Sequence, residues 1–291
     1  MAADLRRFDL PLGRQPLEVR RLRREWEGHA VSPISGAVWG FTADGQAAVT
    51  AVGTVLRNTL NAYRMASVTA GTNMLRAPIS RSTIGTGGQS GAACLVQFRT
   101  TTTTTSVFLG GLGSDSGSVG NTIFAFSTGV NAAAQLRTTV GNASNNTARE
   151  FVGSTVINDG LIHTALVSLD AFNTSGSCTY NIYLDGVHMV EQTDAVVLGS
   201  SHVYNWVTAG SVRRTTDLAV SATCDVALAV GFRRRVSRDQ GVALTRDPWG
   251  ELFESRRIWV PVSAGGAVPT ISALSARLIT STSAQPRISY S

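Results

Sequence analysis

A segment near the C-terminus, residues 224–260, restricts the possible folds of this chain more than any other. Every second residue from Val226 to Phe232 is large and apolar. This alternation predicts a β-strand over residues 225–232. The residues between these positions are mostly small, so we expect the strand to be covered on both faces.

A short helix is expected directly after this strand. Ser237 has the character of an N-cap, and Gln240 follows it at the spacing of a capping box. Pro248 disfavours helical angles at Asp247, so we expect the helix to end at about Arg246.

Large apolar side chains follow the helix at short intervals. They are either an exposed aromatic surface for a ligand or a group that closes the fold. Their position after a capped helix and a proline favours closure, because a short helix must pack its apolar side against the strands before it. We call the predicted group the structural lock, and it comprises Ser237, Pro248, Trp249, Phe253 and Trp259.

The rest of the chain has the pattern of an all-β protein. Turn signals such as Asp44-Gly45 and Asp185-Gly186 separate short strand-like runs, and Gly141–Asn146 predicts a hairpin turn. The 29 glycines and the low charged fraction of 15% suit many turns and few helices. We predict an antiparallel jelly-roll β-sandwich over residues 36–262, with one short C-terminal helix.

The two ends of the chain are expected to be extended arms. Residues 1–35 mix arginines with large apolar residues, which favours docking on a neighbouring subunit; packing along its own domain and nucleic-acid binding are the alternatives. Residues 263–291, rich in Ser, Ala and Thr, predict a tail that is mobile or joins a neighbour as a strand. The predicted docking residues are Arg20, Arg21, Leu22, Arg23, Arg24 and Trp26.

The sequence lacks the residue patterns of common catalytic and metal sites. Jelly-roll glycosidases place carboxylates in an E-x-D-x-x-E spacing, and no glutamate of this chain has that spacing. His163 has no nucleophile motif beside it, which indicates a structural role. Cys94, Cys178 and Cys224 are widely spaced and indicate buried thiols rather than a zinc site. We predict no enzyme activity, no cofactor and no metal.

Targeting signals are also missing from the sequence. The N-terminus has charged residues and no apolar core, which predicts that there is no signal peptide. No apolar run reaches the length of a membrane span. We expect the chain to fold in a cytoplasm.

One stretch suggests a binding surface. Tyr204, Asn205 and Trp206 combine two aromatic rings with an amide, the groups that hold glycans in many β-sandwich domains. The alternative is that the two aromatic side chains lie in the core or at a subunit interface.

Four motifs carry a resemblance to a known family. They are Asp159–His163, Tyr183–Gly186, Val236–Gln240 and the ending Asp247–Gly265. Together they resemble laminin-G-like, concanavalin-A-like jelly-roll domain proteins of tailed bacteriophages. Asp247 and Gln240 depart from the family pattern, which has Asn and Glu there.

This resemblance implies a virion structural protein, most readily a tail fibre or appendage component that reaches the host surface. A capsid decoration protein and a glycan-binding receptor-recognition module are the alternatives. The implied partners are other virion proteins, further copies of the chain, with a trimer favoured, and a bacterial surface glycan. The implied location is the virion, after synthesis in the host cytoplasm.

Overall fold

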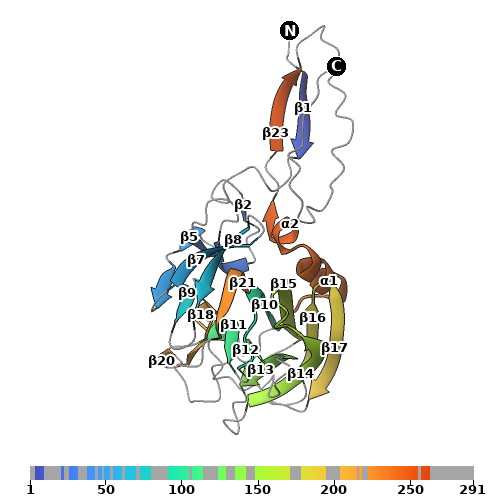
Figure 1. The fold of residues 1–291 in the computed structure, drawn as a ribbon. Coiled ribbons are helices and arrows are strands. Elements are labelled where there is room, and N and C mark those ends of the chain that lie inside the picture. Colours follow the sequence, from blue (N-terminus) through green and yellow to red (C-terminus); the bar gives the residue numbers. More distant parts are fainter. Residues whose placement is uncertain are drawn as a thin grey trace.

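Two antiparallel β-sheets packed face to face form the body of the protein in a computed structural model (Figure 1). The all-β sandwich predicted from the sequence is therefore confirmed. The structure describes residues 4–9, 21–22, 26–31, 38–42, 45–47, 49–52, 55–60, 63–69, 73–79, 91–104, 107–113, 124–128, 135–141, 148–170, 178–194, 204–214, 216–217, 222–254 and 257–262.

The first sheet contains ten strands, and its main path runs β17-β16-β15-β10-β21-β3-β4-β5. A hairpin of β7 and β8 joins it through β21. The bounds are β3 Trp26–Val31, β4 Val38–Thr42, β5 Gly45–Ala47, β7 Val55–Leu60, β8 Tyr63–Val68, β10 Ala92–Thr100, β15 Ile162–Leu169, β16 Cys178–Leu184, β17 Val187–Asp194 and β21 Cys224–Phe232.

The second sheet has seven strands in the order β14-β13-β12-β11-β18-β9-β6. Its bounds are β6 Thr50–Val52, β9 Met74–Pro78, β11 Phe108–Gly113, β12 Phe124–Thr128, β13 Gln135–Gly141, β14 Ala148–Val156 and β18 Trp206–Ala209. Three small pairs lie outside the two sheets: β1 Asp4–Asp9 with β23 Arg257–Val262, β2 Arg21–Leu22 with β22 Phe253–Glu254, and β19 Arg213–Arg214 with β20 Thr216–Asp217.

Strand β21 is the predicted strand of residues 225–232, and all nine of its residues are buried. It pairs with β10 on one side and with β3 and β8 on the other. Val226 faces the core between the two sheets, whereas Leu228 and Val230 face a second core on the opposite side of the sheet. The expectation that both faces of this strand are covered is confirmed.

Helix α1, Arg238–Arg246, has the predicted bounds and cap. The backbone N–H of Gln240 donates to Ser237 Oγ at 3.4 Å, and the N–H of Ser237 donates to Gln240 Oε1 at 3.3 Å. These reciprocal bonds satisfy two backbone donors that the first turn leaves unpaired.

The prediction of one helix is wrong, because a second short helix, α2, spans Pro248–Leu252. Asp247 Oδ1 accepts the backbone N–H of Gly250 at 3.0 Å, so Asp247 caps α2 while it ends α1. Pro248 stands at the first position of α2, where a proline needs no hydrogen-bond donor. The proline that ends the first helix therefore begins the second.

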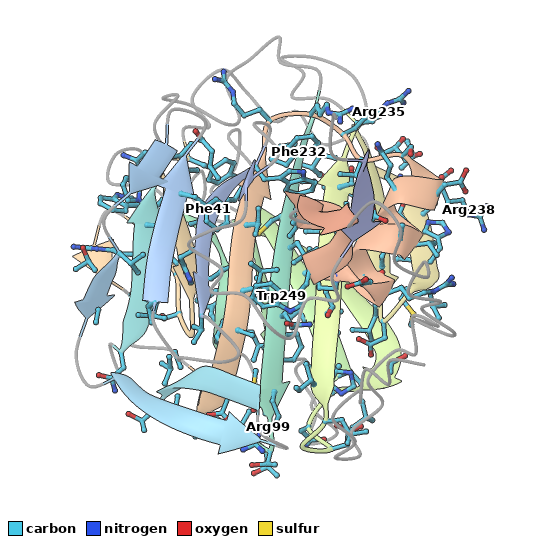
Figure 2. All side chains as sticks on the ribbon, turned by 90° about the horizontal axis from the view of Figure 1, so that it is seen from above. Phe41, Arg99, Phe232, Arg235, Arg238 and Trp249 are labelled. Atoms are coloured by element: carbon cyan, nitrogen blue, oxygen red, sulfur yellow. The ribbon has the colours of Figure 1, made fainter. Side chains whose placement is uncertain are left out.

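The centre of the structural lock lies where the sequence predicts. Trp249 is 8% exposed and packs in the second core with Leu252 of α2. Figure 2 shows Trp249 over the middle strands of the first sheet. Its indole Nε1–H donates to Gln97 Oε1 at 3.0 Å, and Gln97 Nε2–H donates to Thr164 Oγ1 at 3.1 Å. This chain of hydrogen bonds joins α2 to β10 and β15.

Phe253 of the predicted lock lies in β22, opposite Leu22 of β2, and its role in the lock stays a prediction. Another member of the predicted lock, Trp259, needs correction. Trp259 lies in β23, which pairs with β1 and projects from the body beyond α2 (Figure 1). Trp259 is therefore part of a separate two-stranded ribbon, because β1 provides a partner strand that the local sequence pattern does not reveal.

The boundary between arm and sandwich also needs correction. Trp26 is 5% exposed and stacks on Phe232 with ring centroids 4.1 Å apart. Strand β3 lies between β21 and β4, so residues 26–31 belong to the sandwich and Trp26 is a core residue. The backbone of Arg21 lies opposite that of Glu254 in the β2–β22 pair of strands, which agrees with the alternative that this part of the arm packs along its own domain. Arg20, Arg23, Arg24 and the tail of residues 263–291 lie outside the described residues.

The hydrogen bond of Trp249 makes a prediction about stability. Trp249→Phe keeps most of the apolar contact but leaves the buried Gln97 oxygen without its donor. We expect the free energy of unfolding, measured by urea titration, to fall by about 1–3 kcal/mol. Leu161→Ala, at a side chain that is 63% exposed, is the control and should change it by less than about 0.5 kcal/mol. Equal losses in the two variants would contradict this role of Trp249.

Candidate functional site

The predicted glycan-contact residues do not form one surface. Tyr204 is fully buried in the core between the sheets, where burial raises the pKa of its phenol. Its assignment as a glycan contact is wrong, and the alternative of a core residue holds. The backbone of Asn205 is hydrogen-bonded on both sides: its N–H donates to Gly113 O and its carbonyl accepts from Ile79 N–H, both at 3.0 Å.

Trp206 is the one member of this group with a partly exposed ring in β18. The next residue, Val207, points into the core between the sheets, so Trp206 points to the outer face of the second sheet. The guanidinium carbon of Arg76, from the neighbouring strand β9, lies 4.9 Å from the centre of the indole ring. A half-buried aromatic ring with a cation beside it is a suitable contact for a sugar ring or a partner side chain.

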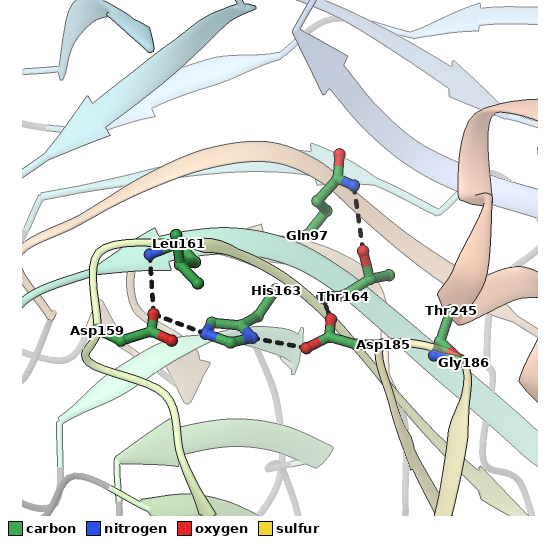
Figure 3. Close-up of polar contacts among 8 residues, drawn as sticks. All are labelled: Gln97, Asp159, Leu161, His163, Thr164, Asp185, Gly186 and Thr245. Carbon is green, nitrogen blue, oxygen red and sulfur yellow. Dashed lines mark hydrogen bonds and ion pairs between the residues drawn. The ribbon is translucent and has the colours of Figure 1, made fainter. Parts of the chain in front are cut away.

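A cluster of polar side chains surrounds His163 at the start of β15 (Figure 3). His163 Nδ1 lies 2.6 Å from Asp185 Oδ2, and His163 Nε2 lies 3.0 Å from Asp159 Oδ1. Each carboxylate is also held by the backbone: Asp185 Oδ1 accepts Thr164 N–H at 2.7 Å, and Asp159 Oδ1 accepts Leu161 N–H at 2.8 Å. We call Asp159, His163 and Asp185 the histidine clamp.

The clamp connects three segments that are distant in the sequence. Asp185 and Gly186 form the tight turn between β16 and β17, both with positive φ, as the Asp-Gly signal predicts. Gly186 N–H donates to Thr245 Oγ1 of α1 at 3.0 Å. The loop before β15, the β16–β17 turn and the end of α1 are thus fixed to one another.

The electrostatics of the clamp favour a charged histidine. Burial lowers the pKa of His163, but hydrogen bonds and charge from Asp185 and then from Asp159 outweigh it, so the pKa is raised above 6.5. Partial burial raises the pKa of Asp159, and hydrogen bonds from Leu161 and His163 outweigh it, so that pKa is lowered. The two carboxylates occupy both ring nitrogens, so neither nitrogen is available to accept a proton from a substrate.

The sequence identifies His163 as structural but does not reveal its partners. Asp159 and Asp185 stand in two of the motifs that carry the family resemblance, yet nothing in the local sequence indicates that their side chains meet. The sequence does predict the two elements separately: Asp185 precedes a glycine in a hairpin turn, and His163 lies at the start of a strand. A prediction that these two elements are neighbours would have identified the contact.

The two cysteines whose side chains the structure describes are buried, and the described residues contain no metal-binding cluster. Cys94 and Cys224 are buried free thiols, and burial raises the pKa of each. Among the described residues no group of three His, Cys, Asp or Glu side chains has a metal-binding arrangement. In the same part of the chain, neither helix has the length and apolar character needed to cross a membrane.

Comparisons with known proteins find similarity in structure and none in sequence. No family model and no curated protein match the sequence. Similar solved structures include the binding domain of Paraclostridial Mosquitocidal Protein 1, with a TM-score of 0.54, 7% identity, and coverage of 80% of this chain and 53% of that one.

Two botulinum neurotoxin binding domains are similar to the same degree. The serotype G domain has a TM-score of 0.51 and 9% identity over 76% of this chain and 50% of its own. The DC domain, solved with rat synaptotagmin II, has a TM-score of 0.51 and 10% identity over 80% of this chain and 52% of its own. This chain spans about half the length of each. Such low identities show a shared fold alone, and these structures provide no link to laminin-G or phage proteins, so that part of the resemblance stays a prediction.

The raised pKa of His163 makes a prediction about pH. The folded protein binds this proton more tightly than the unfolded chain, so the clamp stabilises the fold fully below pH about 6.5 and loses that effect as pH rises through the folded pKa. We expect the stability difference between wild type and His163→Gln to be about 1–2 kcal/mol at pH 6 and to shrink toward pH 9.

The control is His188→Gln, because burial and then Arg238 lower the pKa of His188. Its stabilising effect should be present above pH about 6.5 and lost as the pH falls, which is the opposite trend. Burial also lowers the pKa of His29 to about 4, so His29 adds its own pH dependence to the stability of the fold. This contribution is the same in wild type and variant, and it cancels when the two are compared at each pH by urea unfolding. A difference for His163→Gln that grows with pH would contradict the clamp.

Proposed function

We propose that this chain is a non-enzymatic binding module that is fixed to a larger assembly through its terminal strands. The observation that carries the proposal is the pairing of β1 with β23 outside the sandwich. An isolated two-stranded ribbon is only marginally stable in water, whereas a ribbon that meets further strands of a neighbour is stabilised. The sandwich itself does not include either strand.

The assembly that we propose is a bacteriophage virion, with a tail fibre or appendage position favoured and a capsid decoration position as the alternative. The support is the resemblance of four sequence motifs, together with a sandwich fold found in the binding domains above. Further copies of the chain and other virion proteins are the proposed partners, with a trimer favoured. Localisation of the chain in intact particles by cryo-electron microscopy tests this assignment directly.

The absence of enzyme activity is part of the proposal. Its support is that both ring nitrogens of His163 are engaged by carboxylates and that the two described thiols are buried. His163 therefore offers no free base, and these two thiols offer no exposed nucleophile.

The ribbon predicts how the chain associates. Deletion of residues 1–9 removes β1 and leaves both sheets intact, so we expect self-association to weaken at least about tenfold while the free energy of unfolding changes by less than about 1 kcal/mol. Light scattering over a concentration series measures the first and urea unfolding the second. Deletion of residues 1–3 keeps β1 and is the control. Unchanged association after removal of β1 would rule out the ribbon as the attachment.

A second function, glycan binding at the outer face of the second sheet, is supported by the half-buried ring of Trp206 beside Arg76. This role is compatible with attachment through the ribbon, because the two involve different parts of the molecule. In a tail protein it would contribute to recognition of the host surface.

Trp206 gives the matching prediction. On a glycan array the wild-type protein should bind at least one bacterial surface glycan, and Trp206→Ala should weaken that binding about tenfold, or about 1.4 kcal/mol. Val187→Ala removes an apolar side chain that is 57% exposed on the first sheet and is the control. Retention of full affinity by Trp206→Ala would place glycan binding elsewhere or exclude it.

A further inference from the structure

Four arginines gather where β21 leads into α1. Arg233, Arg234 and Arg235 follow the strand, Arg238 begins the helix, and all four are exposed. Figure 2 shows Arg235 and Arg238 at the outer rim of the molecule on the side of the helices. We call these four residues the arginine corner.

The backbone that carries the arginine corner is held at both ends. On the strand side, the guanidinium carbon of Arg234 lies 4.7 Å from the centre of the Phe232 ring, which stacks on Trp26. On the helix side, Val236 is buried in the second core, and its N–H donates to Ser168 Oγ at 2.7 Å. The corner therefore presents its guanidinium groups from a fixed loop, which lowers the entropy cost of binding a ligand.

Two acidic side chains lie near the helix end of the corner. Asp239 is exposed in the first turn of α1, and Glu191 is exposed on β17. Within the described part of the chain, neither Arg235 nor Arg238 forms an ion pair at 4 Å or less. The field of Arg238 also reaches His188, whose pKa it lowers after the larger effect of burial.

The third acidic group near the corner is already engaged. Asp170 follows β15, and its carbonyl oxygen lies beside Gly91, as does the backbone nitrogen of Arg235. Its Oδ1 accepts Thr179 N–H at 2.8 Å. Exposed Arg235 and Arg238 therefore form no ion pair with Asp239, Glu191 or Asp170 among the described residues, so their charge is available to a ligand.

We propose that the arginine corner is a binding site for an acidic polysaccharide, in which the guanidinium groups pair with its carboxylate, sulfate or phosphate groups. Guanidinium groups form bidentate, charge-assisted hydrogen bonds with such anions and stay charged at every relevant pH. This inference rests on the proposed glycan-binding function and adds to it a chemical class of glycan and a second contact surface.

The surroundings of the corner favour a polysaccharide over a nucleic acid. Single-stranded nucleic acids are held by exposed aromatic rings on which bases stack. Here Phe232 is 2% exposed and Trp26 is 5% exposed, and the two rings stack on each other. Helix α1 packs against β15, β16 and β17, so it is not free to enter a duplex groove.

The test compares single substitutions that remove one charge each, together with Trp206→Ala. Wild type, Arg235→Gln, Arg238→Gln, Arg246→Gln and Trp206→Ala are titrated by calorimetry with dextran sulfate, polygalacturonate, uncharged dextran and an oligothymidylate. Arg246 is exposed at the other end of the same helix, so its variant is the matched control. We expect wild type to bind both acidic polysaccharides and not dextran. Arg235→Gln and Arg238→Gln should each weaken binding about tenfold, and Arg246→Gln less than about twofold.

Three results would overturn the inference. The first is equal weakening of acidic-polysaccharide binding by all three arginine substitutions, which would indicate general charge attraction. The second is tighter binding of the oligothymidylate than of either polysaccharide. The third is loss of acidic-polysaccharide binding in Trp206→Ala with no loss in Arg235→Gln and Arg238→Gln; this would support the glycan-binding function and place it at Trp206. A wild-type protein that binds no glycan on the array and no acidic polysaccharide would instead remove the glycan-binding function itself.

Discussion

The burial of β21 on both faces is the constraint on which the rest of the structure depends. A strand that is apolar on both faces needs a cover on each, and the second sheet supplies only one of them. The other cover is the pair of short helices, which Trp249 joins to the sheet through Gln97 and Thr164. The polar groups of that buried contact pair with one another, so they do not carry the cost of unpaired burial.

Helix α1 is fixed at both ends, and each end holds a different loop. At its start, the loop through Val236 is bonded to Ser168 and carries the arginine corner. At its end, Thr245 is bonded to the hairpin turn whose Asp185 belongs to the histidine clamp. The short helix thus holds two loops in place, and such rigidity pre-organises a binding surface.

Local signals predict the elements that depend on a few neighbouring residues. The strand over 225–232, the Ser237 cap and the Asp185-Gly186 turn are all confirmed for this reason. Contacts between distant segments cannot be predicted from such local signals. The arginines before Trp26 favour an arm, although β21 pairs with the strand that Trp26 begins. The aromatic character of Tyr204 suggests binding, but whether its ring is buried depends on the strands packed around it.

The pairing of β3 with β21, and of β1 with β23, has a consequence for how the chain is made. During synthesis, the first strands leave the ribosome long before the strands that complete their hydrogen bonding. Contacts between such distant segments also form slowly, because a long loop must close first. Strand β1 and the edge of β3 that faces β21 therefore stay without their partners until β23 and β21 have been made, whereas the other edge of β3 can pair early with β4. This interval is when another copy has the best opportunity to pair with the strands that still lack partners.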